Sequence, residues 1–192
     1  MNAARRAKDL LLDPAAAWIA IDKETGDPAY VLSNYVAVLA IVPAAFSFIG
    51  ASLVGVDVAG ADAVRASIFD GLFGAIFGYV LTCATTLVLG FVVNMLAPVF
   101  GGRCNFDSAF KLAVYSFTPV WLAGIFLILP GLRFLTLTGF YGAYVLWRGL
   151  PLMTKAPARS CLGFAAAVVG CALELSYLAA LAQRGLFGTP GL

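Results

Sequence analysis

The chain has 192 residues, of which 62% are apolar and only 11% are charged. Soluble domains carry about 25% charged residues, so this composition predicts an integral membrane protein with no room for a second, soluble domain. The net charge of +2 includes no basic cluster larger than Arg5, Arg6 and Lys8. Nucleic-acid binding is therefore not expected.

The chemistry available to the chain is limited because it contains no histidine. This excludes Ser-His and Cys-His nucleophile pairs and the HExxH metal site. The four cysteines, Cys83, Cys104, Cys161 and Cys171, form no CxxC pair, so they indicate packed or solvated thiols rather than a metal or redox site. We expect no catalytic residue, no metal and no cofactor.

Residues 1–29 mix charged and apolar side chains and predict two short amphipathic helices at the membrane surface. Asp13 followed by Pro14 is typical of an N-cap and the first position of a helix. Trp18 is expected in the interfacial zone of the bilayer, where tryptophan is enriched.

Five apolar stretches follow, and each is long enough to cross the bilayer as a helix. They cover residues 30–56, 68–96, 111–129, 132–151 and 160–182, all approximate. Pro43 should kink the first of them. The predicted fold class is all-α: a single polytopic membrane domain over residues 1–192, with five transmembrane helices preceded by the interfacial segment.

Small residues on the second stretch share one helix face, since Gly71, Gly74 and Gly78 recur at spacings of three and four. Such a pattern lets another helix approach closely, and it predicts a packing seam. Thr82 continues the same face. Asn94, near the inner end, is expected to act as a hydrogen-bond clamp, and Asn105 or Asp107 could cap the next helix.

The third and fourth stretches form a hairpin, because only Leu129-Pro130-Gly131 separates them. Pro119 and Tyr115 lie, with other polar groups, at one depth of the third stretch. This pattern predicts either a broken helix of the kind that transporters use or a plain kink. Gly139 and Gly142 should allow close packing of the hairpin. Replacing Gly139 by leucine is expected to destabilise the bundle more than the same change at Gly149, which is placed at the interface.

The hairpin also carries a family resemblance. Its segments are Tyr115, Pro119, Trp121-Leu122-Ala123-Gly124, Leu129-Pro130-Gly131, Tyr141-Gly142-Ala143-Tyr144, Gly149-Leu150-Pro151-Leu152-Met153 and Pro157. In this order and spacing they resemble the Yip family of five-span membrane proteins, in its short bacterial branch. The likeness extends more loosely from about Arg5 to Leu181.

The resemblance implies a fold and a membrane location. Eukaryotic Yip proteins are implicated in vesicle traffic, bind prenylated Rab-type GTPases and associate with one another. They carry a longer cytosolic N-terminal region than the roughly 29 residues found here, and bacteria lack Rab traffic. A Rab-type partner is therefore not expected.

The distribution of basic residues predicts the orientation. With a cytoplasmic N-terminus, nine basic residues lie inside (Arg5, Arg6, Lys8, Lys23, Arg103, Lys111, Arg148, Lys155 and Arg159) and three outside (Arg65, Arg133 and Arg184). This split follows the positive-inside rule. We expect an inner-membrane protein with its C-terminus on the periplasmic side.

Glu174 is the one acid deep inside a predicted span. Gly170 lies on its face, so we expect this face to pack against another helix, with Glu174 protonated and hydrogen-bonded to Thr82 or Tyr79. A functional polar site and a plain interhelical clamp both remain open.

Two functions fit these observations. The first is a non-catalytic membrane protein that binds lipids or membrane partners, itself included, or organises the bilayer. The alternative is a small oligomeric transporter or channel that uses Glu174 and the helix break at Pro119.

Overall fold

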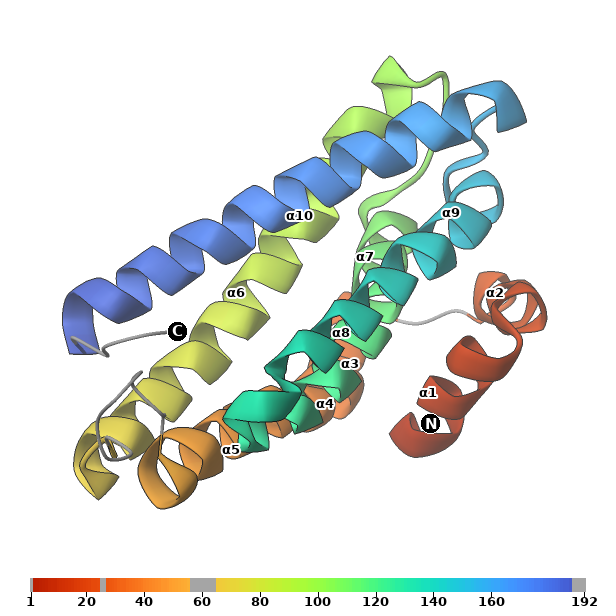
Figure 1. Ribbon diagram of the computed structural model, residues 1–192. Helices are drawn as coiled ribbons and strands as arrows, with labels where there is room; N and C mark the ends of the chain where they lie inside the picture. The colour runs from red at the N-terminus through yellow and green to blue at the C-terminus, as the bar shows by residue number, and fades with distance from the viewer. Residues whose placement is uncertain (1, 25–26, 56–64, 188–192) are drawn as a thin grey trace.

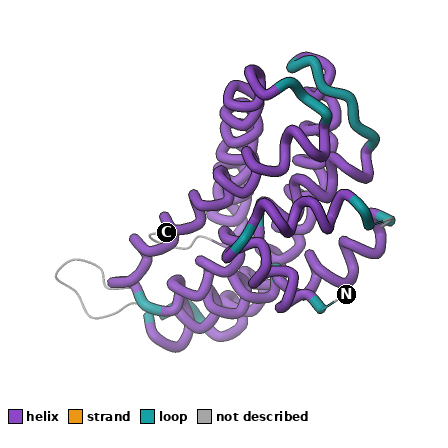
Figure 2. The backbone as a smooth tube through the Cα atoms, turned by 90° about the vertical axis from the view of Figure 1, so that its right-hand side faces the viewer, coloured by secondary structure: helices purple, strands orange, loops and turns teal. Residues whose placement is uncertain are grey.

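The computed structural model describes residues 2–24, 27–55 and 65–187, and in these ranges helix is the only regular secondary structure (Figure 2). The all-α prediction is therefore confirmed. Within the described ranges, four helices are long and apolar enough to cross a membrane: Pro28–Val54, Ile68–Val99, Phe106–Ile128 and Ala158–Leu186. The predicted count of five is not exact. The fourth predicted stretch is helical but carries Arg133 and Arg148, and it is not among these four.

The N-terminal segment folds into two short helices, α1 (Ala3–Leu12) and α2 (Pro14–Asp22). As predicted, Asp13 caps α2, and its Oδ1 accepts a hydrogen bond from the backbone N–H of Ala16 at 3.0 Å. The two helices form a hairpin at one edge of the molecule (Figure 1), and α2 packs against α9 (Tyr141–Thr154).

Trp18 is covered by protein and is not on the outer surface, and its depth in the bilayer stays a prediction. Its side chain is fully buried, and its Nε1–H donates to the backbone carbonyl of Val145 at 2.9 Å. Gly149 makes room for the ring, because a Cβ there would lie 2.5 Å from Cε2 of Trp18. Gly149 is thus a buried contact point of the core.

The first span is an irregular helix. It consists of α3 (Pro28–Val31), the π-helical η1 (Leu32–Val36), α4 (Ala37–Leu39), α5 (Ile41–Phe48) and the π-helical η2 (Ile49–Val54). The interruption falls at Ala40, three residues before Pro43, whose ring lacks the N–H needed to continue the helix. The end predicted for this span, Val56, lies outside the described residues.

The two longest helices are α6 (Ile68–Val99) and α10 (Ala158–Phe187), which lie side by side (Figure 1). The glycine face of α6 meets neighbouring elements: Gly71 faces Ser52, and the carbonyl of Gly74 accepts from Nε2 of Gln183 at 2.8 Å. A Cβ at Gly78 would lie 3.1 Å from the same nitrogen.

The third span contains α7 (Phe106–Ser116), α8 (Thr118–Ala123) and the 3-10 helix η3 (Gly124–Ile128). Asn105 caps it, with Oδ1 accepting from the N–H of Ser108 at 3.0 Å. After Leu129 the chain returns through the 3-10 helix η4 (Pro130–Phe140) into α9. Tyr115 lies at the centre of the core, with ring centroids 4.8 Å from Tyr35 and 6.2 Å from Trp18.

Candidate functional site

The site forms where the third span changes from α7 to α8. The N–H of Phe117 is shared between the carbonyls of Ala113 and Val114, at 3.3 and 3.1 Å, and Pro119 offers no N–H to the turn before it. The hydroxyl of Tyr35 hydrogen-bonds Oγ1 of Thr118 at 2.8 Å and ties the break to the first span. The break is thus fixed by its neighbours.

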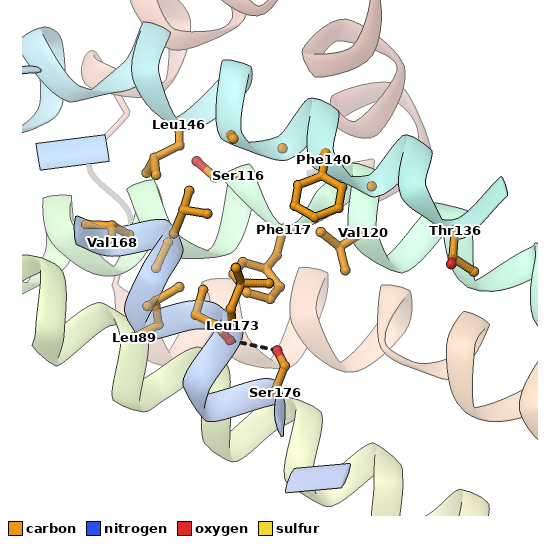
Figure 3. Close-up of a pocket in the computed structure, with 16 residues that line it drawn as sticks. Leu89, Ser116, Phe117, Val120, Thr136, Phe140, Leu146, Val168, Leu173 and Ser176 are labelled. Atoms are coloured by element: carbon orange, nitrogen blue, oxygen red, sulfur yellow. Dashed lines mark hydrogen bonds between the residues drawn. The ribbon is translucent and has the colours of Figure 1, made fainter. Parts of the chain in front are cut away.

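An apolar pocket of about 200 Å³ opens beside this break, between α6, α7–α8, η4–α9 and α10 (Figure 3). Its walls are mostly aliphatic and aromatic: Leu89, Phe117, Val120, Phe140, Leu146, Val168, Val169, Ala172 and Leu173. Gly142 brings α9 close to α7, because a Cβ there would lie 2.5 Å from the carbonyl oxygen of Ser116. The pocket is therefore a partly open apolar space between helices.

Ser116 is the polar group that this pocket leaves unsatisfied. It is only 5% exposed, and its hydroxyl oxygen has no hydrogen-bond partner among the described residues. The other hydroxyls of the lining are satisfied: Ser176 donates to the carbonyl of Ala172 at 2.8 Å, and Thr136 to that of Arg133 at 2.6 Å (Figure 3). A buried polar group without a partner costs about 1–3 kcal/mol, so Ser116 marks a place where a bound molecule would be stabilised.

Comparison with known proteins confirms the family resemblance that the hairpin motifs carry. The family model described as the Yip1 domain matches residues 8–181. The chain belongs to the Yip1-domain family. It is 26% identical over 166 residues to the inner membrane protein YohC of Escherichia coli K12, an alignment that covers 84% of this chain and 85% of that protein. YohC of Escherichia coli O6:H1 strain CFT073 matches equally, and no solved structure matches.

Glu174 does not take the position that the sequence suggested for this Yip1-domain chain. Its side chain is exposed on α10, and both proposed partners bond elsewhere. The hydroxyl of Thr82 donates to the carbonyl of Gly78 on its own helix at 2.9 Å, and that of Tyr79 to the carbonyl of Ala37 at 3.2 Å. Gly170 on the same face is exposed too, with no atom of the described chain within 4 Å of a Cβ built there. Two predictions are therefore wrong: that the Glu174 face packs against another helix, and that Glu174 is an interhelical clamp.

The remaining predicted residues lie in separate places. Asn94 accepts a hydrogen bond from Sγ of Cys104 at 3.8 Å. Burial raises the pKa of the Cys104 thiol, so the proton stays on sulfur at neutral pH. Tyr115 belongs to the aromatic core, and Pro119 lines a different, shallow pocket beside Leu11. The structure thus does not unite Glu174 with the helix break, as the transporter alternative required.

The packing role of the hairpin glycines has a structural basis. A Cβ at Gly139 would lie 3.2 Å from Cα of Val120, so Gly139 and Gly142 both bring the returning segment against the third span. Sequence reasoning noticed that polar groups gather near Pro119 but did not single out Ser116. Ser116 could have been found from a pattern in the sequence: a serine one turn before a proline, with glycines on the helix that faces it.

Proposed function

We propose that this protein is a non-catalytic, multi-pass protein of a bacterial inner membrane that binds a neutral, apolar lipid-like molecule between its helices. The observation that carries the proposal is the pocket of about 200 Å³ with the unsatisfied hydroxyl of Ser116 in its wall. The inner-membrane location is proposed from the similarity to YohC.

Size and lining narrow the class of ligand. Apolar cavities of about 150 Å³ hold a molecule of the size of benzene, so this pocket accommodates a ring or a short length of chain. Ser116 lies ten residues into the span that begins at Phe106, which is about 15 Å along the helix axis. At that depth a charged headgroup would be strongly disfavoured. We infer a neutral ligand with one hydrogen-bonding oxygen.

The test is to fill the pocket. Ala172 lines it and is half-buried, so the ring of Ala172→Phe can enter the empty space. Native mass spectrometry of the full chain, purified from its own membranes, should show a retained neutral molecule that this variant loses. Ser116→Ala should weaken retention about fivefold to tenfold, the equivalent of one hydrogen bond.

The control is Ala166→Phe, an identical change at an exposed position of α10 outside the pocket lining. It should keep the bound molecule. Equal retention by the two phenylalanine variants would show that any bound lipid sits elsewhere and would refute the proposal.

The orientation is part of the same proposal, since the nine-to-three split of basic residues supports a cytoplasmic N-terminus. A reporter that is active only outside the cytoplasm should be active when fused after Leu192 and silent when fused after Asn105. The reverse pattern would invert the orientation.

A further inference from the structure

A second cavity, of about 490 Å³, lies where the N-terminal helix hairpin meets α3 and the second half of α7. Unlike the pocket between the spans, it is lined by charged groups. Three cations, Arg5, Arg6 and Lys111, face two carboxylates, Asp9 and Glu24. The cavity therefore carries one positive charge in excess.

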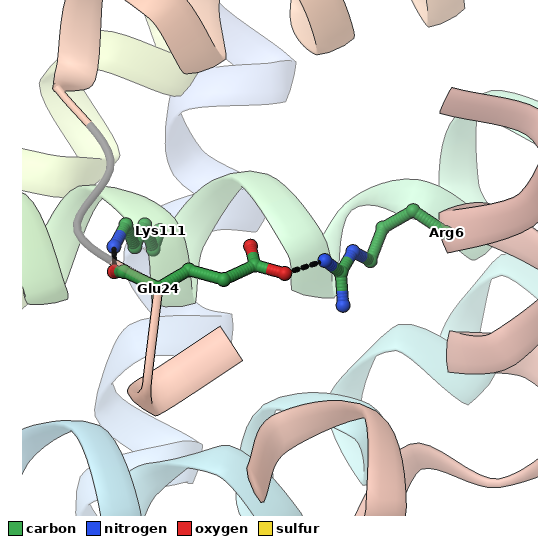
Figure 4. A network of polar contacts seen from close by, with 3 residues as sticks. All are labelled: Arg6, Glu24 and Lys111. Carbon is green, nitrogen blue, oxygen red and sulfur yellow. Dashed lines mark hydrogen bonds and ion pairs between the residues drawn. The ribbon is translucent and has the colours of Figure 1, made fainter. Parts of the chain in front are cut away.

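Lys111 is the most buried of these cations, and Figure 4 shows it beside Glu24. This lysine is only 7% exposed, and its Nζ donates to the backbone carbonyl of Glu24 at 2.5 Å. The carboxylate of Glu24 points the other way and forms an ion pair with Arg6, whose side chain is 12% exposed (Figure 4). A carbonyl has no net charge, and no carboxylate of the described residues forms an ion pair with Lys111.

The depth of the cavity matches the phosphate layer of a bilayer. Lys111 is the last charged residue before residues 112–132, an uncharged stretch of 21 residues that is long enough to cross the hydrocarbon core. The polar headgroup region occupies roughly 5–8 Å on each side of the hydrocarbon core. A cation held there is in reach of lipid phosphates on one side and of dissolved phosphate compounds on the other.

We propose that this cavity is a binding site for a phosphate group, with Lys111 as its buried cation, the partly buried Arg6 beside it and Arg5 at its rim. Ammonium and guanidinium groups make their strongest hydrogen bonds to such oxyanions. The cavity is larger than a phosphate needs, and Asn2 and Asp9 offer polar contacts to whatever the phosphate carries. The phosphate belongs either to a phospholipid headgroup or to a water-soluble phosphate compound.

Arg5 and Lys8 provide a matched test on the same helix. Both are exposed on α1 and both are basic, but only Arg5 is in the cavity lining. Arg5→Glu and Lys8→Glu change the net charge equally and remove no buried contact. For the full chain in detergent, the probes are inorganic phosphate, phosphatidylglycerol and a diacylglycerol with the same acyl chains.

Binding is followed by the shift in melting temperature and by native mass spectrometry. For a headgroup site, phosphatidylglycerol should be retained in preference to diacylglycerol, and inorganic phosphate alone should have no effect. For a site that takes soluble phosphate, inorganic phosphate should raise the melting temperature relative to chloride at equal ionic strength. In either case Arg5→Glu should raise the Kd about tenfold or more, and Lys8→Glu should not.

Lys111→Gln is a second variant and should abolish the effect of the probe while keeping the pocket between the spans intact. Ala172→Phe should leave phosphate binding unchanged, which separates this site from the neutral-ligand pocket. The proposal is overturned if Arg5→Glu and Lys8→Glu behave alike, or if no probe binds in preference to its control.

Discussion

The third and the last of the four long apolar helices have similar hydropathy but very different surroundings. In Phe106–Ile128, 61% of the most apolar stretch is buried inside the protein, whereas in Ala158–Leu186 the share is 17%. The third span contacts the first span, α6, α9 and η4, while α10 contacts mainly α6 and α9. The third span is therefore the centre of the fold, and α10 lies at its edge.

This difference shows what small residues mean in a membrane protein. Next to the third span, glycines are contact points: Gly142 lies against the carbonyl of Ser116, and Gly149 against Trp18 and Leu112. On α10, Gly170 faces no other helix in the described chain. Glycines therefore mark helix contacts in one region and an exposed helix surface in the other.

The largest effect is expected when leucine replaces a glycine of the crowded region. Gly149→Leu should lower the free energy of unfolding by about 3 kcal/mol or more, because its side chain would have to displace the ring of Trp18. Gly139→Leu should cost less, about 1–3 kcal/mol, since its neighbour Val120 is further away at 3.2 Å. This order reverses the one that the sequence suggested.

Gly170→Leu is the control at the edge of the fold. It should change stability by less than about 0.5 kcal/mol beyond the gain in helix propensity. Denaturation of the three variants in one detergent gives the comparison. Equal losses at positions 149 and 170 would mean that another molecule covers α10 or that α9 does not pack on Trp18.

A smaller loss is expected for Trp18→Phe, at about 2 kcal/mol. The change removes the hydrogen bond to Val145 and part of a fully buried ring. Trp147→Phe is matched in chemistry, but its side chain is 42% exposed, so it should cost less than about 0.5 kcal/mol. Chemical denaturation followed by tryptophan fluorescence measures both, and similar costs would place Trp18 at the lipid surface after all.

Whether an interaction could be predicted from the sequence depends on how far apart its two residues lie along the chain. The caps by Asp13 and Asn105 involve neighbours three residues away. The first was predicted, and Asn105 was one of the two candidates for the second. The place of Trp18 depends on Val145, which lies 127 positions later in the chain. No local pattern contains that pairing, so the tryptophan was assigned to the interface where such residues are common.

The candidate site shows the same limit. The sequence predicted a group of polar residues near Tyr115 and Pro119. It could not predict that the hydroxyl of Ser116 lacks a partner, because this depends on how four separate elements pack around it. The charged cavity was missed because Lys111 and Glu24 are 87 positions apart. Small residues around Glu174 predicted a helix neighbour, and a sequence does not distinguish a face covered by protein from one covered by lipid.

The smallest effect concerns Gln183 and Glu174, two polar residues in the C-terminal half of α10. Gln183 donates from Nε2 to the carbonyl of Gly74 on α6, so Gln183→Leu should cost about 1 kcal/mol. Glu174 is exposed, and removing a carboxyl group from a lipid-facing surface eases insertion. Glu174→Leu should therefore leave the melting temperature in detergent unchanged and the amount inserted into membranes equal or higher. A loss of stability as large as that of Gln183→Leu would show that a neighbouring group holds Glu174, and the edge position of α10 would then be wrong.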